Sequence, residues 1–203
     1  MVPTAVLMLL LDIRALARGF TPVTVGAHSV LMLLGVALVG AFYALIICSY
    51  LRRGPAVATA GPVTARVVAV VATFTPFSFP LLPRAGAGPA RQIMAGVLLL
   101  AGTAFAVWAL RWLGRNLSVI AQARGVADQG PYRFVRHPLY TGEIVSALGL
   151  ALTSGTLAAF GLWAALVAMQ VYRARAEERV LLQALPGYRD YRARAAALLP
   201  RMF

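Results

Sequence analysis

Long apolar stretches alternate with short polar segments along most of the chain. A helix needs roughly 20 mostly apolar residues to cross a hydrocarbon core of about 30 Å. Because lipid offers no hydrogen-bond partners to the backbone, such stretches fold as helices, whereas the strands of a membrane barrel would alternate apolar and polar residues. The pattern therefore predicts an all-α, polytopic integral membrane protein. The strongest apolar stretches are residues 30–48, 67–82, 93–110 and 157–171.

Five transmembrane helices are predicted from these stretches and the breaks between them. The second helix should be kinked because it contains Pro76 and Pro80. The last two are shorter, are joined by the small or polar residues Thr153-Ser154-Gly155-Thr156, and predict a tight helical hairpin. The second hairpin helix should continue into the cytoplasm as far as Leu182. The predicted helices cover residues 25–50, 63–82, 91–113, 138–152 and 156–172.

The first 20 residues allow two interpretations. Residues 2–11 are apolar, but Asp12, Arg14 and Arg18 follow too soon for a full span. The pattern favours an interfacial helix whose polar end lies among the headgroups, over a short first span.

Composition agrees with a membrane location. Apolar residues make up 61% of the 203 residues and charged residues only 12%, against about 25% charged in a soluble domain. The net charge of +13 comes from arginines that flank the apolar stretches. Positive residues beside spans mark the cytoplasmic side, so their placement argues against nucleic-acid binding and predicts that the arginine-rich ends of the spans face the cytoplasm. We expect the protein in the inner (plasma) membrane. The absence of Lys beside many Arg, Ala and Gly residues indicates a GC-rich, bacterial source.

Polar residues that could bind a ligand or take part in catalysis gather at two places on the predicted cytoplasmic side. The first is the loop that leads into the hairpin, where His137 precedes Pro138. A residue before proline avoids the helical conformation, and proline suits the first helical turn, so His137 should cap the helix. The second is the end of the hairpin, where Arg173 and Glu177 lie four residues apart on one helix face. A hairpin brings both places together.

The loop with His137 and the helix end with Arg173 and Glu177 indicate a functional site only when taken together. A lone interfacial histidine or a solvated Arg/Glu helix end is more often structural, and exposed ion pairs contribute under ~1 kcal/mol. Together, however, the two places would offer cations for a carboxylate, carboxylates for ribose hydroxyls or an ammonium, and tyrosines for a sulfonium. No metal-binding spacing, nucleophile elbow or phosphate-binding loop accompanies them in the sequence.

Three motifs extend these two places. They are Leu113-Gly-Arg-Asn-Leu-Ser, Gly130-Pro-Tyr-Arg-Phe-Val-Arg-His-Pro-Leu-Tyr-Thr-Gly-Glu143, and Arg175-Ala-Glu-Glu-Arg179 with Tyr188 and Tyr191. Together they resemble the isoprenylcysteine carboxyl methyltransferase family, which is related to the membrane phospholipid N-methyltransferases. The resemblance covers roughly residues 91–200 and divides the chain into residues 1–90, with the first two spans, and a methyltransferase core at 91–203.

The resemblance implies S-adenosylmethionine as cofactor, S-adenosylhomocysteine as product, and a lipophilic acceptor that enters sideways between helices. It implies catalytic roles for Arg173, which would orient an acidic acceptor, and for Glu178. Methyl transfer from a sulfonium to a carboxylate, thiolate or amine needs alignment and little water rather than a metal. The implied cofactor-binding residues are Gly130, Tyr132, Arg136, His137, Pro138, Tyr140, Gly142, Glu177 and Glu178.

Two other functions stay open at this point. One is N-methylation of a phospholipid amine, which would need a base and would suffer repulsion from Arg173. The other is a non-enzymatic role as a membrane transporter or assembly protein, which predicts no cofactor binding. The sequence identifies neither the acceptor nor the oligomeric state.

Overall fold

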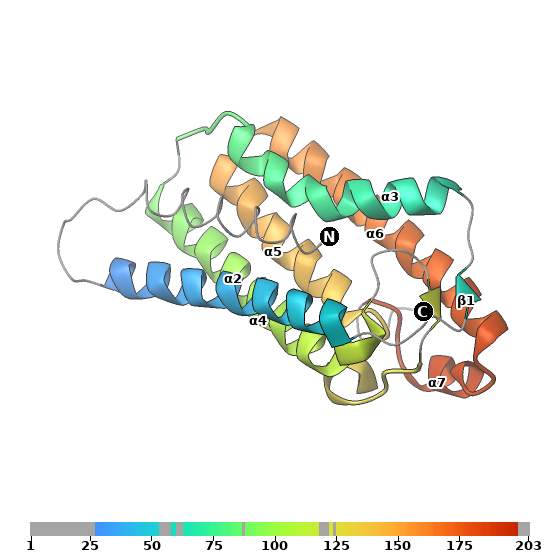
Figure 1. Cartoon of the computed structure of the whole chain (residues 1–203). Coiled ribbons are helices and arrows are strands. Elements are labelled where there is room, and N and C mark those ends of the chain that lie inside the picture. The colour runs from blue at the N-terminus through green and yellow to red at the C-terminus, as the bar shows by residue number, and fades with distance from the viewer. Residues whose placement is uncertain are drawn as a thin grey trace.

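The computed structural model of the chain is an assembly of long helices (Figure 1). It describes residues 27–52, 58–59, 63–86, 88–117, 122–123 and 125–198, so the interpretation of residues 1–20 falls outside the described residues. The all-α fold class predicted from the apolar stretches is confirmed. The long helices are α2 (Ala27–Arg52), α3 (Val63–Phe74), α4 (Pro89–Leu113), α5 (Pro138–Ser154) and α6 (Leu157–Ala184).

Three stretches of the described chain are long and apolar enough to cross a membrane: Val63–Leu81, Pro89–Leu113 and Leu157–Ala184. These correspond to three of the five predicted spans. The hairpin helix α5 has 17 residues, or about 25 Å, and is short for a core of about 30 Å. A total of five spans therefore stays a prediction.

The predicted kink takes the form of a change of helix type. After Phe74 the α-helix α3 continues as the 3₁₀ helix η1 (Thr75–Leu81). Pro76 cannot donate a backbone hydrogen bond, and the Thr75 hydroxyl donates to the carbonyl of Val71 at 2.8 Å. The missing donor and the competing hydroxyl together end the α-helical hydrogen-bond ladder here.

Helices α4 and α5 pack with their backbones in close contact through glycine. A Cβ on Gly142 would lie 2.7 Å from the nitrogen of Ala106 and 2.7 Å from the oxygen of Gly102. Gly149 is equally close to α4, at 2.6 Å from the oxygen of Ala95. Small residues are what allow membrane helices to approach this closely.

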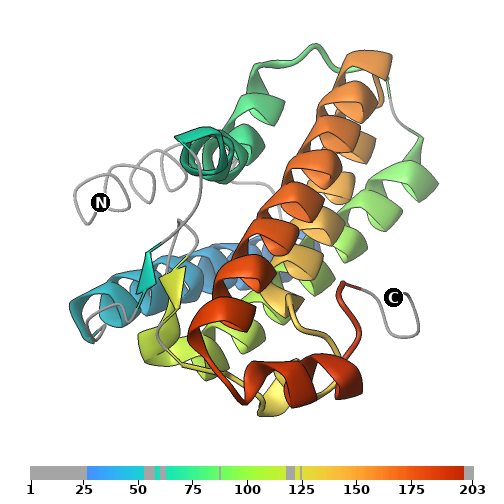
Figure 2. The same ribbon diagram turned by 90° about the vertical axis from the view of Figure 1, so that its right-hand side faces the viewer.

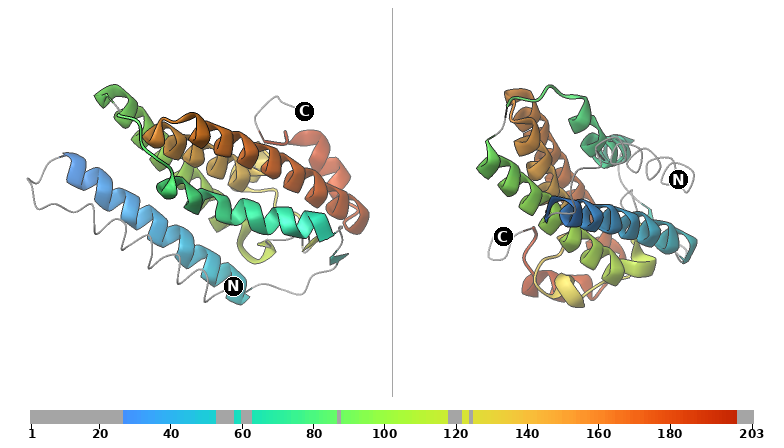
Figure 3. Two further views of the ribbon diagram at one scale, coloured as in Figure 1. Left: turned by 90° about the horizontal axis from the view of Figure 1, so that it is seen from above. Right: turned by 90° about the vertical axis from the view of Figure 1, so that its left-hand side faces the viewer.

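The predicted hairpin of α5 and α6 is confirmed. Gly155 ends α5 in the left-handed conformation, with a φ of 69° that favours glycine. The Thr156 side chain then accepts a hydrogen bond from the nitrogen of Ala159 and caps α6. Helix α3 packs against α6, and α2 packs against α4 (Figure 3).

Shorter elements gather where α6 ends. They include the two-residue strands β1 (Ala58–Thr59) and β2 (Gln122–Ala123), which pair antiparallel with Ala58 opposite Ala123. Figure 2 shows the short helix α7 (Tyr188–Arg194) lying across this end of the bundle. The 3₁₀ helices η2 (Gly114–Asn116) and η3 (Gly130–Arg133) complete the long loop between α4 and α5.

Residues 195–198 form a strap that follows α7 and runs beside the loop into α5. The nitrogen of Arg136 donates to the oxygen of Ala196 at 2.7 Å, and the nitrogen of His137 donates to the oxygen of Ala197 at 3.1 Å. The Thr141 hydroxyl donates to the oxygen of Leu198 at 2.7 Å. The strap therefore fixes the backbone of the Arg-His-Pro segment.

Candidate functional site

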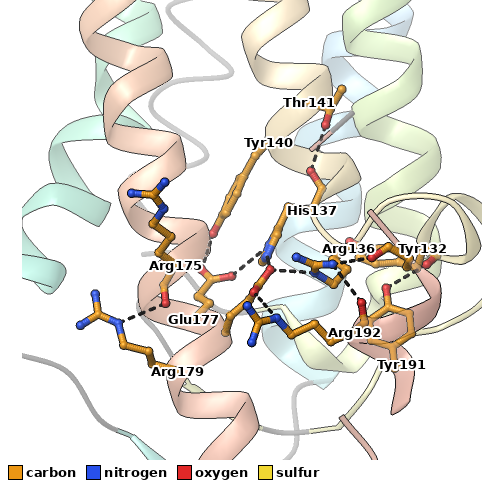
Figure 4. Close-up of polar contacts among 12 residues, drawn as sticks. Tyr132, Arg136, His137, Tyr140, Thr141, Arg175, Glu177, Arg179, Tyr191 and Arg192 are labelled. Carbon is orange, nitrogen blue, oxygen red and sulfur yellow. Dashed lines mark hydrogen bonds and ion pairs between the residues drawn. The ribbon is translucent and has the colours of Figure 1, made fainter. Parts of the chain in front are cut away.

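His137 lies between the two carboxylates of α6. Its Nε2 is 3.2 Å from Oε1 of Glu178, and its Nδ1 is 3.8 Å from Oε2 of Glu177. The imidazole is buried, and it occupies the cap position of α5 that its place before Pro138 predicts. Figure 4 shows the histidine, Tyr140 and Glu177 pointing toward one another, while Arg175 and Arg179 lie outside the group.

Glu178 is held by cations from two further segments. The Nε of Arg136 donates to Oε1 of Glu178 at 2.8 Å, and the Nε of Arg192 lies 3.3 Å from Oε2. The Nη1 of Arg136 also donates to the carbonyls of Arg192 and Ala195. The buried Arg136 guanidinium thus links α6, α7 and the strap, and its charge keeps a buried carboxylate paired.

Tyr140 contacts His137, Glu177 and Arg173. Its ring stacks on His137 with an interplanar angle of 1° and a centroid distance of 5.6 Å. Its hydroxyl donates to Glu177. The guanidinium carbon of Arg173 lies 4.6 Å from the centre of its ring, within cation–π range. These contacts fix both the ring plane and the hydroxyl direction.

A cavity opens beside this cluster, walled by phenol rings and apolar side chains with one carboxylate, that of Glu177. The buried hydroxyl of Tyr188 has no hydrogen-bond partner among the described residues, whereas the Tyr191 hydroxyl donates to the carbonyl of Tyr132 at 2.8 Å. Burial raises the pKa of Tyr132, Tyr188 and Tyr191, so these phenols stay neutral at physiological pH. The lining residues are Leu113, Asn116, Gly125, Val126, Ala127, Tyr132, Arg136, His137, Leu139, Tyr140, Glu177, Leu181, Tyr188 and Tyr191.

A separate groove of about 570 Å³ runs between α5 and α6. Most of its wall is apolar, and its charged end is formed by Arg136, Arg175, Glu178 and Arg192. Arg136 lines both the groove and the cavity, so the two spaces meet at this side chain. The apolar part is lined by Ile144, Val145, Trp163, Val167, Val171, Ala174, Ala197 and Leu198.

The predicted site residues divide into two groups in the structure. Tyr132, Arg136, His137, Tyr140 and Glu177 line the cavity, and Glu178 lies on the groove side of His137. These residues come from three segments that the hairpin brings together, as expected.

The remaining predicted residues have other surroundings. Gly142 faces the backbone of α4 at Ala106, because the close approach that it allows is between helices. Gly130 has a φ of 58° and supports the Trp112 ring, and Pro138 begins α5. Arg173 is buried between Gln170 and the Tyr140 ring, and it is absent from the residues that line the cavity or the groove.

Sequence reasoning gave no role to several residues that shape the site. Val126 and Leu181 line the cavity, and Arg192 pairs with Glu178. Tyr188 and Tyr191 belong to the motif that resembles the family, but the resemblance gives them no place in the site. The spacing of Tyr188, Tyr191 and Arg192 is a signal for these residues, because one short helix can place all three side chains next to the cluster.

Comparison with known proteins finds similarity in the part of the chain that contains the hairpin. The phospholipid methyltransferase family model matches residues 90–186, which contain α5 and α6 in full. A curated relative, the cobalt-zinc-cadmium resistance protein CzcN of Cupriavidus metallidurans, is 37% identical over 79 residues. That alignment covers 38% of this chain and 36% of the relative, so the chain matches little more than a third of the relative's length. Residues 90–186, just under half of the chain, are therefore similar to the phospholipid methyltransferase family.

Proposed function

We propose that this protein is an S-adenosylmethionine-dependent membrane methyltransferase whose acceptor is a lipophilic molecule with an acidic group. The observation that carries the proposal is the meeting of two unlike spaces at Arg136, a tyrosine-walled cavity with a carboxylate and an apolar groove with a cationic end. A group-transfer enzyme needs two adjoining sites of this kind. The family match supports the same reaction class.

The cavity suits the chemistry of the cofactor. The phenol of Tyr188 is buried without a partner in the described chain, as expected of a group that awaits a ligand. The Glu177 carboxylate can accept hydrogen bonds from hydroxyl or ammonium groups, and the neighbouring aromatic rings stabilise a cation. When bound, the cofactor supplies an electrophilic methyl group on a sulfonium. Glu177, Tyr140, Tyr132 and Tyr188 would hold it.

The groove supports a lipophilic acceptor. Its apolar wall between α5 and α6 can take a hydrocarbon chain, and its charged end carries three arginines against the single carboxylate Glu178. That excess of positive charge favours an anionic head and opposes an ammonium head. Arg175 and Arg192 would orient the head, while the ion pairs of Glu178 with Arg136 and His137 fix the boundary toward the cavity.

The protein would act by alignment. Burial of Arg136 and His137 keeps the boundary between the two spaces rigid and poor in water. Effective alignment of two reactants can supply on the order of 7 kcal/mol of a reaction barrier. An acidic acceptor is nucleophilic once ionised, so neither a covalent enzyme intermediate nor a proton acceptor is required of the chain.

A second candidate function is N-methylation of a phospholipid amine, which the description of the matched family favours. An amine must lose a proton before it reacts, and Glu178 at the charged end of the groove is the available acceptor among the described residues. The arginines around Glu178 disfavour both an ammonium head and proton uptake. The acidic acceptor therefore ranks first.

We also place the catalytic end at the cytoplasmic face of the bacterial inner membrane. The arginines of α6, α7 and the loop before α5 gather at the end of the bundle that carries the cavity, and positive residues are retained on the cytoplasmic side.

The cofactor proposal is tested by isothermal titration of S-adenosylhomocysteine into the detergent-purified full chain. We expect saturable binding that His137→Ala and Glu177→Gln each weaken by tenfold or more, equivalent to about 1.4 kcal/mol. Arg179→Gln is the control because this exposed arginine on α6 lies outside the cluster. Absence of binding to folded wild-type protein would refute the proposal.

The acceptor proposal is tested with Val167→Trp, which fills the groove from α6. We expect this variant to bind S-adenosylhomocysteine like the wild type but to lose transfer of labelled methyl groups from the cofactor to lipophilic carboxylic acids. Phosphatidylethanolamine is assayed in parallel. Label that enters only the amine lipid would favour the second candidate function.

A further inference from the structure

A polar triad lies one to two turns deeper in the bundle than the cavity. Gln170 is fully buried on α6, and its Nε2 donates to the carboxylate of Glu143 on α5. Its Oε1 accepts a hydrogen bond at 3.1 Å from Nη1 of Arg173. Polar and ionisable groups inside a membrane protein are costly, and they mark function more often than packing.

The triad joins the site through a single aromatic ring. Arg173 lies over Tyr140 at 4.6 Å from the ring centre. The same ring stacks on His137 and carries the hydroxyl that donates to Glu177. Two groups that line the cavity, Tyr140 and Glu177, therefore depend on where the Arg173 guanidinium is held.

Glu143 and Gln170 supply the Arg173 guanidinium with a paired charge and a hydrogen bond that fixes its rotamer. A buried Arg must be paired, and its long side chain has several rotamers unless hydrogen bonds select one. Glu143 provides the negative charge from the neighbouring helix, and Gln170 connects that carboxylate to Arg173, because an amide can donate at one end and accept at the other. The contact order is therefore Glu143, Gln170, Arg173, Tyr140.

We propose that Glu143 and Gln170 are positioning residues that hold Arg173 over the Tyr140 ring and thereby shape the wall of the cofactor cavity. The inference rests on the proposed function and adds to it two residues that do not line the cavity. A triad that served only to join α5 and α6 would affect stability and leave cofactor affinity unchanged, which gives the test its two readouts.

The test uses exchange of the amide and the carboxylate. Glu143→Gln keeps the size of the side chain but replaces the carboxylate with a neutral amide, and Gln170→Leu removes both hydrogen bonds. In the double variant Glu143→Gln/Gln170→Glu, the new carboxylate can accept from Arg173 and from the new amide, so charge and connectivity return. Thr153→Val is the control, since its hydroxyl bonds only to the carbonyl of Gly149 within α5.

Affinity for S-adenosylhomocysteine and thermal unfolding are measured on each full-length variant in detergent. We expect Glu143→Gln and Gln170→Leu to weaken binding by roughly tenfold, about 1.4 kcal/mol, and the double variant to return to within about threefold of wild type, a difference of about 0.65 kcal/mol. Thr153→Val should bind like the wild type.

The outcomes separate the two proposals. Wild-type protein that fails to bind refutes the proposed function itself. If the wild type and folded Glu143→Gln bind S-adenosylhomocysteine with equal affinity, the positioning role alone is overturned. Should Gln170→Leu not fold, the comparison of Glu143→Gln with the double variant decides, because a double variant no tighter than Glu143→Gln also overturns the inference.

Discussion

Arg136 shows at the residue scale how the site is held together. Its guanidinium donates to Glu178 on α6 and to the carbonyls of Arg192 and Ala195, while its backbone pairs with the strap. No residue within ten positions in the sequence supplies these partners. The Arg136 side chain therefore joins α6, α7 and the strap, which lie far from it in the sequence.

Arg136→Met should lower the free energy of unfolding by roughly 1.5–3 kcal/mol, because it removes the shortest ion pair of Glu178 but leaves those with His137 and Arg192. Thermal unfolding in detergent measures the loss. Arg133→Met is the matched control, since this exposed arginine lies three residues earlier in the same loop. Equal stability of the two variants would contradict the linking role.

Two tyrosines of α7 allow a sharper comparison of ligand binding with stability. Tyr191→Phe removes the hydrogen bond to the Tyr132 carbonyl and should cost about 1 kcal/mol of stability. Tyr188→Phe removes a buried hydroxyl without a partner in the described chain, so stability should stay level or rise by up to about 1 kcal/mol. Yet Tyr188→Phe should weaken S-adenosylhomocysteine binding. Unchanged affinity would mean that this hydroxyl does not meet the ligand.

At the scale of elements, the glycine contacts set the position of α5. Gly142→Ala would place its Cβ 2.7 Å from the Ala106 nitrogen, and overpacking of this kind costs about 1–3 kcal/mol. Gly161→Ala on α6 meets nothing within 4 Å and should leave stability level or raise it by up to about 1 kcal/mol through helix propensity. Circular dichroism melts of both variants test the difference. Similar melting temperatures would show that α4 and α5 can separate without cost.

Elements with local sequence determinants were predictable, and those made by distant contacts were not. The hairpin followed from its apolar stretches and its Gly155-Thr156 turn, and the cap at His137 followed from Pro138. The strap gave no such pattern, because residues 195–198 acquire their role only by pairing with the loop before α5. Arg173 shows the same limit: its spacing to Glu177 predicted a shared helix face, but only the fold shows that Tyr140 and Gln170 surround it.

At the scale of the whole molecule, the two ends of the bundle differ in charge. Helix α6 has 28 residues, or about 42 Å, which exceeds a hydrocarbon core of about 30 Å and lets its arginine-rich end leave the membrane. The opposite end is closed by a loop tied to the hairpin tip, where the nitrogen of Ala85 donates to the oxygen of Ser154 at 2.8 Å. The bundle therefore has one end that carries the cavity and most of the arginines, and an opposite end that the hairpin tip and its loop close.

This difference predicts the orientation of the protein in the cell. In a Cys48→Ser background, Gly86→Cys reports on the hairpin-tip end and Gly187→Cys on the α7 end. A Cβ at either position meets no non-neighbouring atom within 4 Å in the described chain. Because arginines are retained in the cytoplasm, a membrane-impermeant maleimide should label Gly86→Cys in intact cells and Gly187→Cys only after the membrane is opened. The reverse pattern would place the cavity outside the cell, away from the cytoplasmic supply of S-adenosylmethionine that the proposed reaction requires.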